Sequence, residues 1–292
     1  MLDQTGVCVR VANVAGRLAL VNGTRSVDVE KVSDGRFGPD PQGVYAQWDA
    51  FRDWAAGADL PDGEEIDLAA LGPPAPAPRQ VFAIGLNYRD HATEGGFGVP
   101  ADPAVFTKFP ASFTGPYGQI VLPAGGTTDW EVELVGVIGR RAEWVPRQDA
   151  WHYLAGLTVG QDLSERTSQT SGEAPQFSLA KSFTGFSPTG PWLVSIDEFA
   201  DPADLELGCY LNGEQVQQAR TRDLIYDLPE LVSRLSRVLP LLPGDVIFTG
   251  TPAGVGFSRN PQRVLAPGDE LVSYVEGIGQ MRHWFAPGLA AT

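Results

Sequence analysis

The chain has 292 residues, 43% of them hydrophobic, which is typical of one large globular domain or of a domain with a small appendage. Its formal net charge of −15 is spread along the chain and argues against nucleic acid as a partner, because phosphate contacts need clustered Lys and Arg. Two distant cysteines, Cys8 and Cys209, argue against a disulfide scaffold and a thiolate zinc site. With neither a signal peptide nor a long apolar run in view, we expect a cytoplasmic protein that has no membrane partner.

The N-terminal part of the chain is predicted to form a small domain over residues 1–72. Apolar stretches at 7–11 and 18–21 are typical of a β-hairpin, and the aromatic spacing of 47–56 is typical of a helix. Residues 72–78, with the sequence GPPAPAP, mark the clearest change in composition, and proline-rich segments of this kind favour extended conformations. We therefore place a domain boundary at this segment.

The main domain, predicted over residues 80–292, consists mostly of strand patterns. A buried strand over 81–85 is expected to lead into a short helix that carries His91 and Glu94. The best helix pattern covers 228–239, where leucines and valines follow i, i+3, i+4 spacing. Further strands are expected over residues 130–138, 154–159 and 246–248, with a hairpin over 270–285. Because strands outnumber helices, we predict an α+β fold that is mostly β.

A group of acidic residues is the most informative feature of the main domain. Glu131 and Glu133 are two residues apart in a predicted strand, so their side chains point to the same face. Two carboxylates side by side in a buried strand repel each other unless a cation lies between them. Asp162 follows the next predicted strand and adds a third carboxylate, and such oxygen ligands suit Mg²⁺, Mn²⁺ or Ca²⁺ rather than Zn²⁺. The alternative is that the glutamates lie on a solvated strand face and that Asp162 is a turn residue.

His91 and Glu94 are candidates for acid–base chemistry. At i, i+3 on a helix their side chains are neighbours, and a carboxylate beside an imidazole orients it and raises its basicity. Such a pair can remove a proton from water near neutral pH. The alternative is an ion pair on a helix surface. We expect His152 to be packed and His283 to be structural.

Two basic residues are candidates for binding an anionic substrate. Lys181 lies in a stretch rich in Phe and Gly with few charges, where the alternative is an ordinary surface residue. Arg166 follows Asp162 by about one helical turn and is suited to a carboxylate. Its alternative is a salt bridge with Glu165 or another acid.

Several segments, taken in order, resemble the fumarylacetoacetate hydrolase superfamily, and within it the acylpyruvate hydrolase-like branch. The similarity covers about residues 80–285. It rests on residues 85–91 (GLNYRDH), 129–134 (DWEVEL), 161–166 (QDLSER), 181–183 (KSF), 190–192 (GPW) and 243–256 (PGDVIFTGTPAGVG). Departures from the family pattern, such as Trp130 in place of Tyr and Gln161 in place of Asn, leave the substrate open.

The resemblance implies a mixed β-sandwich roll, a catalytic domain after the boundary and a homodimer. It implies Mg²⁺ or Mn²⁺ held by Glu131, Glu133 and Asp162. It also implies that His91 and Glu94 activate water and that Lys181 is their catalytic partner. The positions that line the substrate site in the family match Arg166, Gln169 and Thr251. The loop after Glu94 resembles the mobile lid of the family.

The predicted function is that of a divalent-metal-dependent hydrolase that breaks a carbon–carbon bond in a small 1,3-dicarbonyl oxo-acid, of the acylpyruvate or fumarylpyruvate type. One alternative keeps the metal site but changes the reaction, to decarboxylation of oxaloacetate or to isomerisation or hydration of a dienoic oxo-acid. Another is a non-catalytic, metabolite-binding homologue. The pair His91 and Glu94 favours hydrolysis, because such a pair can be absent or idle in the other reactions. It also argues against a binding protein, which needs no residues that activate water.

Overall fold

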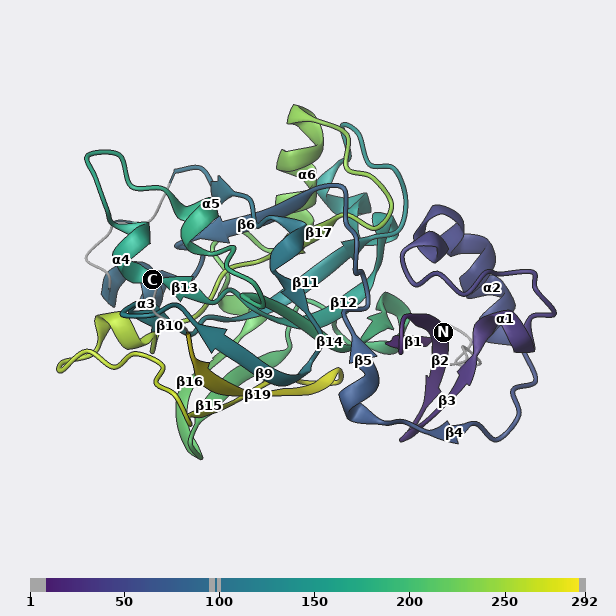
Figure 1. The fold of residues 1–292 in the computed structure, drawn as a ribbon. Helices are drawn as coiled ribbons and strands as arrows, with labels where there is room; N and C mark the ends of the chain where they lie inside the picture. Colours follow the sequence, from purple (N-terminus) through teal and green to yellow (C-terminus); the bar gives the residue numbers. More distant parts are fainter. Residues whose placement is uncertain (1–8, 95–97, 99–100, 289–292) are drawn as a thin grey trace.

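A sheet of twelve strands runs through the computed structural model, which describes residues 9–94, 98 and 101–288 (Figure 1). Along its main path the strands follow in the order β4 (Glu64–Glu65), β3 (Arg25–Asp28), β2 (Arg17–Asn22), β1 (Arg10–Val14), β14 (Ser187–Ser195), β12 (Leu154–Gln161), β11 (Val132–Ile138), β17 (Val246–Phe248), β6 (Val81–Gly85) and β7 (Ala104–Phe106). Two short strands join at the side, β5 (Leu71–Gly72) next to β1 and β8 (Phe113–Thr114) next to β14. Neighbouring strands at the centre are antiparallel, except that β17 runs parallel to β6.

A second sheet of five strands lies against the first, so that the two form a sandwich. Its order is β16 (Glu214–Arg220), β15 (Glu206–Leu211), β18 (Glu270–Val275), β19 (Gly279–Pro287) and β9 (Tyr117–Leu122). Strands β15, β18 and β19 contact β11, β12 and β14, and the main hydrophobic core fills the space between them. A two-stranded ribbon consists of β10 (Thr128–Asp129) and β13 (Ser164–Glu165).

The helices are short and lie at the periphery of the sheets. They are α1 (Val29–Val32), α2 (Trp48–Gly57), α3 (Arg89–Glu94), α4 (Arg166–Gln169), α5 (Phe177–Ala180) and α6 (Leu228–Val238). The prediction of an α+β fold that is mostly β is therefore confirmed. No helix in the described part of the chain is both long and apolar enough to cross a membrane.

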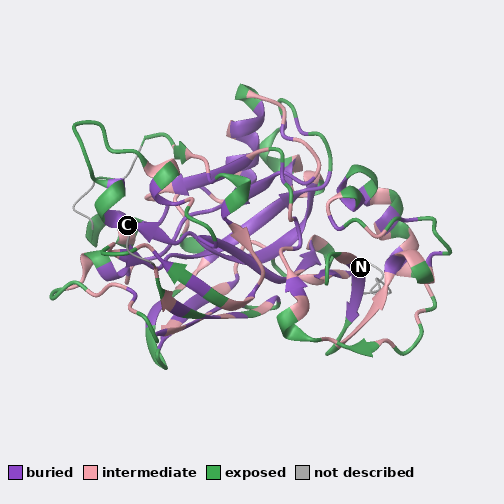
Figure 2. Cartoon of the chain, viewed as in Figure 1, coloured by how far each residue is buried: buried purple, intermediate pink, exposed green. Residues whose placement is uncertain are grey.

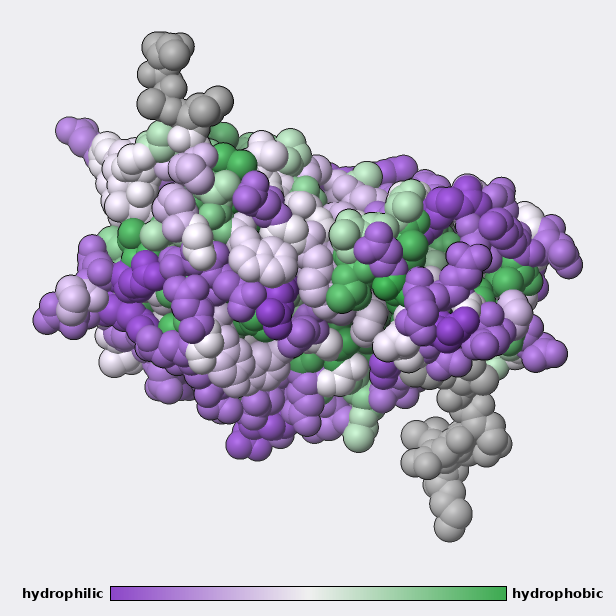
Figure 3. All heavy atoms as spheres, turned by 60° about the horizontal axis from the view of Figure 1, so that its bottom comes forward, coloured by the Kyte–Doolittle hydropathy of each residue, from purple (hydrophilic) through white to green (hydrophobic). Residues whose placement is uncertain are grey.

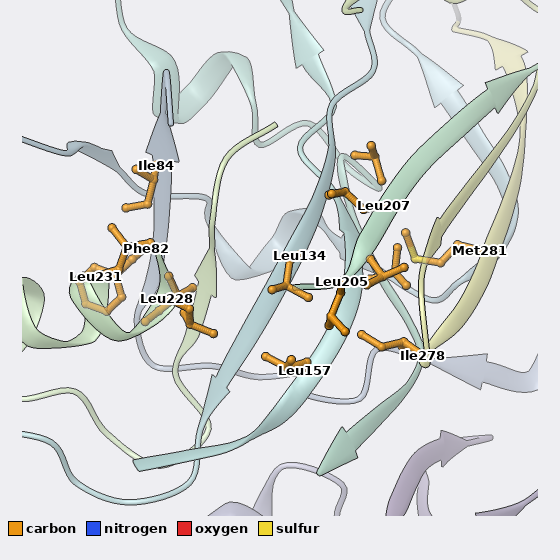
Figure 4. Packing of buried hydrophobic residues seen from close by; sticks show 14 of the residues in the cluster. Phe82, Ile84, Leu134, Leu157, Leu205, Leu207, Leu228, Leu231, Ile278 and Met281 are labelled. Atoms are coloured by element: carbon orange, nitrogen blue, oxygen red, sulfur yellow. The ribbon is translucent and has the colours of Figure 1, made fainter. Parts of the chain in front are cut away.

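Helix α6 packs closely on the large sheet. The amphipathic pattern that predicted it buries its leucines, and Figure 4 shows Leu228 and Leu231 beside Phe82 of β6. On β11, a Cβ atom added to Gly136 would lie 2.8 Å from Leu228 Cδ2. Glycine at this position therefore lets the helix approach the strand, and the large sheet is buried beneath it (Figure 2).

The N-terminal strands extend the large sheet. The predicted hairpin forms as β1 and β2, and β1 pairs with β14 through Arg10 opposite Val194. The predicted helix forms as α2, whose Trp48 and Phe51 are buried. This small N-terminal region is part of the fold, while the division into domains over 1–72 and 80–292 remains a prediction. Cys8 lies outside the described residues, and Cys209 is a free, buried thiol.

The face turned forward in Figure 3 is mainly hydrophilic, and its apolar residues form several separate groups. This surface agrees with the high content of acidic side chains in the chain. The deeper, apolar part of the molecule is where the strands that position the site meet.

Candidate active site

Three carboxylates converge where β11 begins and β12 ends. These two strands are antiparallel, so Asp162, just after β12, lies beside Glu131, just before β11, and the Asp162 N–H donates to the Glu131 carbonyl at 2.9 Å. Glu133 belongs to β11 itself. One carboxylate oxygen of each residue lies within 4.8 Å of those of the other two, and all three residues are buried. The solvated-face alternative for the glutamates is therefore wrong.

Lys181 bridges two of these carboxylates. Its ammonium group donates to Glu131 Oε2 and to Asp162 Oδ2, each at 2.7 Å. The side chain is only 3% exposed, so the alternative of an ordinary surface lysine is wrong as well. Helix α5 ends at the residue before Lys181 and brings it under the cluster.

A second lysine at the cluster was not predicted. Lys108 is fully buried and its Nζ donates to Asp162 Oδ1 at 2.6 Å and to the carbonyl of Lys181. Lys108 thus connects Asp162, at the end of β12, to the segment that carries Lys181. The sequence holds a signal for it, since only three lysines occur in the chain, and Lys108 lies in the apolar stretch from Phe106 to Phe109. A lysine that is rare in a chain and surrounded by apolar residues is a candidate for a buried partner of an acid.

Arg166 is held by two acids. Its Nε and Nη2 donate to Asp129 Oδ2 at 3.0 and 2.8 Å, and Nη2 lies 2.7 Å from Glu131 Oε1. Its Nη1 donates to the side-chain oxygen of Gln169 at 2.9 Å. Glu165 is not its partner, because that carboxylate caps helix α4 by accepting backbone N–H groups. Arg166 therefore forms salt bridges, as the alternative expected, but with Asp129 and Glu131 rather than with Glu165.

Asp129, which was not predicted as a site residue, links this arginine to the glycine-rich loop after β17. It accepts the backbone N–H groups of Gly256 and Phe257 at 2.7 and 2.9 Å. A Cβ atom at Gly256 would lie 2.8 Å from Asp129 Oδ1 and 1.8 Å from the Arg263 carbonyl oxygen. Glycine is therefore required for the loop to come this close to the acid.

The same loop binds Glu133 and holds Thr251. The Gly250 N–H donates to Glu133 Oε2 at 2.6 Å. The Thr251 hydroxyl donates to the Val132 carbonyl at 2.9 Å and accepts from the Gln217 amide at 2.8 Å. Because the hydroxyl proton of Thr251 is already engaged, its side chain lines the site as a fixed surface.

His91 and Glu94 form the expected pair on α3. His91 Nδ1 lies 3.0 Å from Glu94 Oε1, and Glu94 also accepts the N–H of Gly254 at 3.1 Å. A carboxylate only accepts, so the proton of the neutral imidazole lies on Nδ1 and leaves Nε2 free to accept a proton. The two side chains are 13% and 25% exposed, which places them at the rim of a cavity rather than on an open helix surface.

One cavity of about 560 Å³ is lined by seven of the nine predicted site residues, while Glu133 and Asp162 are buried outside its lining. Its lining includes His91, Glu94, Glu131, Arg166, Gln169, Lys181 and Thr251. The structure thus brings together side chains from α3 and α4, the residues just before β11 and just after α5, and the loop after β17. The predicted lid after Glu94 includes residues 95–97 and 99–100, which lie outside the described residues.

Comparison with known proteins agrees with this geometry. Residues 80–286 match the family model described as fumarylacetoacetate (FAA) hydrolase C-terminal. The chain belongs to the fumarylacetoacetate hydrolase family. The matched segment contains every residue of the acidic cluster, both lysines and the pair on α3.

Relatives within the fumarylacetoacetate hydrolase family carry different activities in their names. The chain is 41% identical over 221 residues to the mitochondrial oxaloacetate tautomerase FAHD2A of Bos taurus, a match that spans 75% of this chain and 69% of the relative. A crystal structure from Mycobacterium smegmatis, provisionally named HpcE, is 55% identical with a TM-score of 0.92, covering 96% of this chain and 100% of that one. A maleylpyruvate hydrolase from Sphingobium sp. SYK-6, in complex with manganese(II) and pyruvate, is 29% identical with a TM-score of 0.79 over the same shares of the two chains.

The charges of the cluster fit a divalent cation. Four buried carboxylates face three buried cations, so one negative charge is left over; these groups are Asp129, Glu131, Glu133 and Asp162, with Lys108, Arg166 and Lys181. Glu133 is the acid of this group with no Lys or Arg in salt-bridge contact among the described residues, and burial together with the nearby charges of Asp162 and Glu131 raises its pKa. A further cation beside it would favour its charged form. Only oxygen ligands converge there, which is the set that Mg²⁺ and Mn²⁺ prefer. The residues of this family member therefore fit a dication.

The pKa values of the neighbouring groups show which charges the protein stabilises without a metal ion. Burial alone would raise the pKa of Glu131, but the charges of Lys181 and Arg166 hold this pKa at about 2. Burial would lower the pKa of Lys181, yet the two carboxylates that it bridges raise it. Burial lowers the pKa of Lys108, and Asp162 offsets part of that effect. Lys181 and Arg166 thus stabilise the ionised form of Glu131, whereas burial and the neighbouring acids favour the neutral form of Glu133.

Proposed function

We propose that this protein is a divalent-metal-dependent hydrolase that breaks a carbon–carbon bond in a small 1,3-dicarbonyl oxo-acid of the acylpyruvate type. The observation that carries the proposal is that His91, paired with Glu94, opens on the same cavity as Lys181 and Glu131. Glu131, Glu133 and Asp162 would hold Mg²⁺ or Mn²⁺. When bound, such an ion polarises the oxygens of an oxo-acid and stabilises negative charge on them.

The side chains around the cavity supply the proton transfers. His91 Nε2 takes a proton from a water molecule, while Glu94 accepts the Nδ1–H and stabilises the imidazolium. The hydroxide adds to the carbonyl carbon that is farther from the substrate carboxylate. The bond between that carbon and the neighbouring CH₂ then breaks, giving a carboxylic acid and the carbanion of pyruvate. This carbanion takes up the proton held by His91, so that one water is consumed in all.

Lys181 and Gln169 orient the substrate in this proposal. The ammonium group of Lys181 is fixed by two carboxylates and faces the cavity, where it stabilises negative charge that develops on the substrate. The side-chain oxygen of Gln169 accepts from Arg166, which leaves its NH₂ group to donate to the substrate carboxylate. Thr251 contributes a fixed wall.

A second candidate function is keto–enol tautomerisation of oxaloacetate. The similarity to the tautomerase of Bos taurus favours it, at 41% identity over 221 residues. That reaction needs only the movement of a proton between carbon and oxygen, for which His91 and Lys181 suffice without activated water. The two candidates therefore differ in whether a carbon–carbon bond breaks.

A panel of substrates tests the proposal. The purified protein with Mg²⁺ or Mn²⁺ is mixed with acylpyruvates, fumarylpyruvate and oxaloacetate, while loss of enol absorbance and release of pyruvate and CO₂ are followed. Hydrolysis predicts equal amounts of pyruvate and of a second carboxylic acid. Fast decay of the oxaloacetate enol without pyruvate, combined with inert acylpyruvates, would replace the proposal by the tautomerase. Pyruvate with CO₂ from oxaloacetate alone would indicate a decarboxylase.

We also infer a homodimer, because the family resemblance implies one. Light scattering on the purified protein would measure it, and a monomeric mass at micromolar concentration would contradict it.

A further inference from the structure

The Lys and Arg side chains that line the cavity lie together at one end. Arg166 and Lys181 line it beside Glu131, and both are engaged with buried carboxylates there. With a dication added, the excess negative charge of the buried cluster becomes a single positive charge. One carboxylate of an oxo-acid substrate would balance it, so this end is suited to one anionic group.

The rest of the lining is largely apolar. It includes Leu86 after β6, Phe106 of β7, Phe177 of α5, and Val255 and Phe257 of the loop after β17. The rings of Phe106 and Phe177 meet edge to face, with centroids 5.5 Å apart. These side chains come from four separate elements, so the fold itself gives the cavity its apolar wall.

Two phenylalanines of this wall pack against the cations that already pair with buried carboxylates: Lys181 Nζ lies 5.2 Å from the ring centroid of Phe106, and Arg166 Cζ lies 5.9 Å from that of Phe257. A second substrate carboxylate would need a further cation. Among the lining residues that the structure describes, Arg166 and Lys181 are the only Lys or Arg, and His91 is paired with Glu94. The segments outside the description, residues 1–8, 95–97, 99–100 and 289–292, contain no Lys, Arg or His in their sequence. Glu94 also lies in the lining and would repel a second anion. An unpaired charge buried beside phenylalanines is strongly unfavourable.

The size of the cavity exceeds that of a small oxo-acid. Its volume of about 560 Å³ falls within the range of roughly 300–1,000 Å³ that is usual for sites binding much larger molecules. A three-carbon oxo-acid at the charged end would leave most of this space beside the phenylalanines. The remaining space is suited to a part of the substrate that is stabilised by burial against apolar side chains.

We propose that the substrate carries a single carboxylate, at the charged end, and an uncharged, apolar acyl group that lies against Phe106, Phe177 and Phe257. This inference rests on the proposed function and names its substrate class: acylpyruvates with a hydrocarbon tail rather than dicarboxylates of the fumarylpyruvate type. The lining thereby acts as the determinant of specificity, through burial of apolar area on one side and exclusion of charge on the other.

Binding of two inert oxo-acid analogues tests this without any turnover. N-(6-methylheptyl)oxamate and N-(5-carboxypentyl)oxamate have tails of matched length and branching, and differ in that the second ends in a carboxylate. Isothermal titration calorimetry in the presence of Mg²⁺ or Mn²⁺ should give a dissociation constant at least about tenfold lower for the alkyl tail. Equal affinities, tighter binding of the carboxylated tail, or binding of neither compound would overturn the inference.

A charge introduced at the wall sharpens the test. Phe177→Arg should shift the ratio of the two dissociation constants by at least about tenfold toward the carboxylated tail. The matched control Phe177→Leu keeps the wall apolar and should leave the preference with the alkyl tail. A preference unchanged by Phe177→Arg, in a variant whose circular dichroism shows that it folds, would place the tail elsewhere and contradict the assignment.

The outcome is separable from the reaction. If the protein cleaves no acylpyruvate but still prefers the alkyl oxamate, the hydrolase proposal fails and the specificity of the cavity stands. If it cleaves acylpyruvates and binds both probes equally, the hydrolase proposal stands and the inferred specificity of the cavity fails.

Discussion

Buried ionisable groups occur in two contrasting regions of this molecule. In the cluster below the cavity, carboxylates and cations contact one another at hydrogen-bond distance, as where Lys181 bridges Glu131 and Asp162 at 2.7 Å. In the five-stranded sheet, His283 of β19 is 1% exposed and its only polar contact among the described residues is the carbonyl of Gly115, at 3.0 Å. The cluster keeps its charges through mutual pairing, whereas the isolated imidazole avoids charge.

The comparison explains why the two regions respond to change in different ways. A paired charge whose partner is removed becomes an unpaired buried charge, which is costly. A buried neutral group does not change the free energy of unfolding with pH until the pH is low enough for the unfolded chain to bind a proton. The paired charges of the cluster are the ones suited to function, because fixed charges can attract a cation and a substrate.

The largest expected effect is that of removing the metal from the charged region. Chelation with EDTA should lower turnover by at least about 10³-fold, and Mg²⁺ or Mn²⁺ should restore it, since the cluster lacks one positive charge without the ion. At about 100 times its dissociation constant the ion should also raise the free energy of unfolding by about 2.7 kcal/mol. Full activity of a sample shown by elemental analysis to be free of metal would contradict the proposed role.

Two histidine substitutions compare the rim of the cavity with the five-stranded sheet. His91→Ala should reduce kcat by about 10²–10³-fold because it removes the proposed base, while metal binding is kept. His283→Gln should leave kcat nearly unchanged. Activity assays and metal titrations of both variants measure the contrast, and comparable activity losses in the two would deny His91 a special role.

Lys108→Met probes pairing within the cluster. The substitution keeps the length of the side chain but removes the charge that contacts Asp162, so we expect the metal-free protein to lose about 3 kcal/mol of unfolding free energy in urea titrations. The matched control is Arg234→Met, at a residue that is 38% exposed and paired with Glu230, where the loss should be below about 1 kcal/mol. Equal losses of unfolding free energy in the two variants would show that burial does not strengthen the contribution of the Lys108–Asp162 pair to stability.

Local patterns in the sequence predicted the parts of the fold that are continuous in the chain. The strand over 81–85 and the strand over 246–248 match β6 and β17, and the helix pattern over 228–239 matches α6 to within one residue. Strand β11 begins at Val132, two residues later than predicted. Strands such as β14 and β16 were missed, because prolines and glycines interrupt the first and the second is mostly polar.

The candidate site was predicted in part for the same reason. The spacing of Glu131 and Glu133 is a local signal, and the i, i+3 pair on α3 is another. Asp129 and Lys108 were missed because their partners lie 37 and 54 residues away in sequence, at contacts that only the folded sheets create. His152 was expected to be packed, and this was wrong: it is exposed on the short helix Arg147–Tyr153. His283 was expected to be structural, and its burial confirms this.

The isolated histidine gives the smallest effect, and its sign follows from its surroundings. Burial lowers the pKa of His283 from 6.5 to about 4. The Gly115 carbonyl can only accept, so Nε2 carries the proton of the neutral ring, and a second proton on Nδ1 would find no partner among the described residues. Above pH 6.5 the ring is neutral in both the folded and the unfolded chain. As the pH falls toward 4, only the unfolded chain binds a proton, and stability declines.

Between pH 7 and pH 5 this group should therefore cost about 2 kcal/mol of unfolding free energy, at roughly 1.36 kcal/mol for each pH unit below 6.5. Urea titrations of the wild-type protein and of His283→Gln at pH 7, 6 and 5 would isolate the effect, since all other titrating groups are common to both proteins and cancel in the difference. The difference should change in favour of the variant as the pH falls. Parallel curves would mean that His283 takes up a proton in the folded state as readily as in the unfolded one. The five-stranded sheet would then hold a charge as the cluster does, and the contrast between pairing and neutralisation would fail.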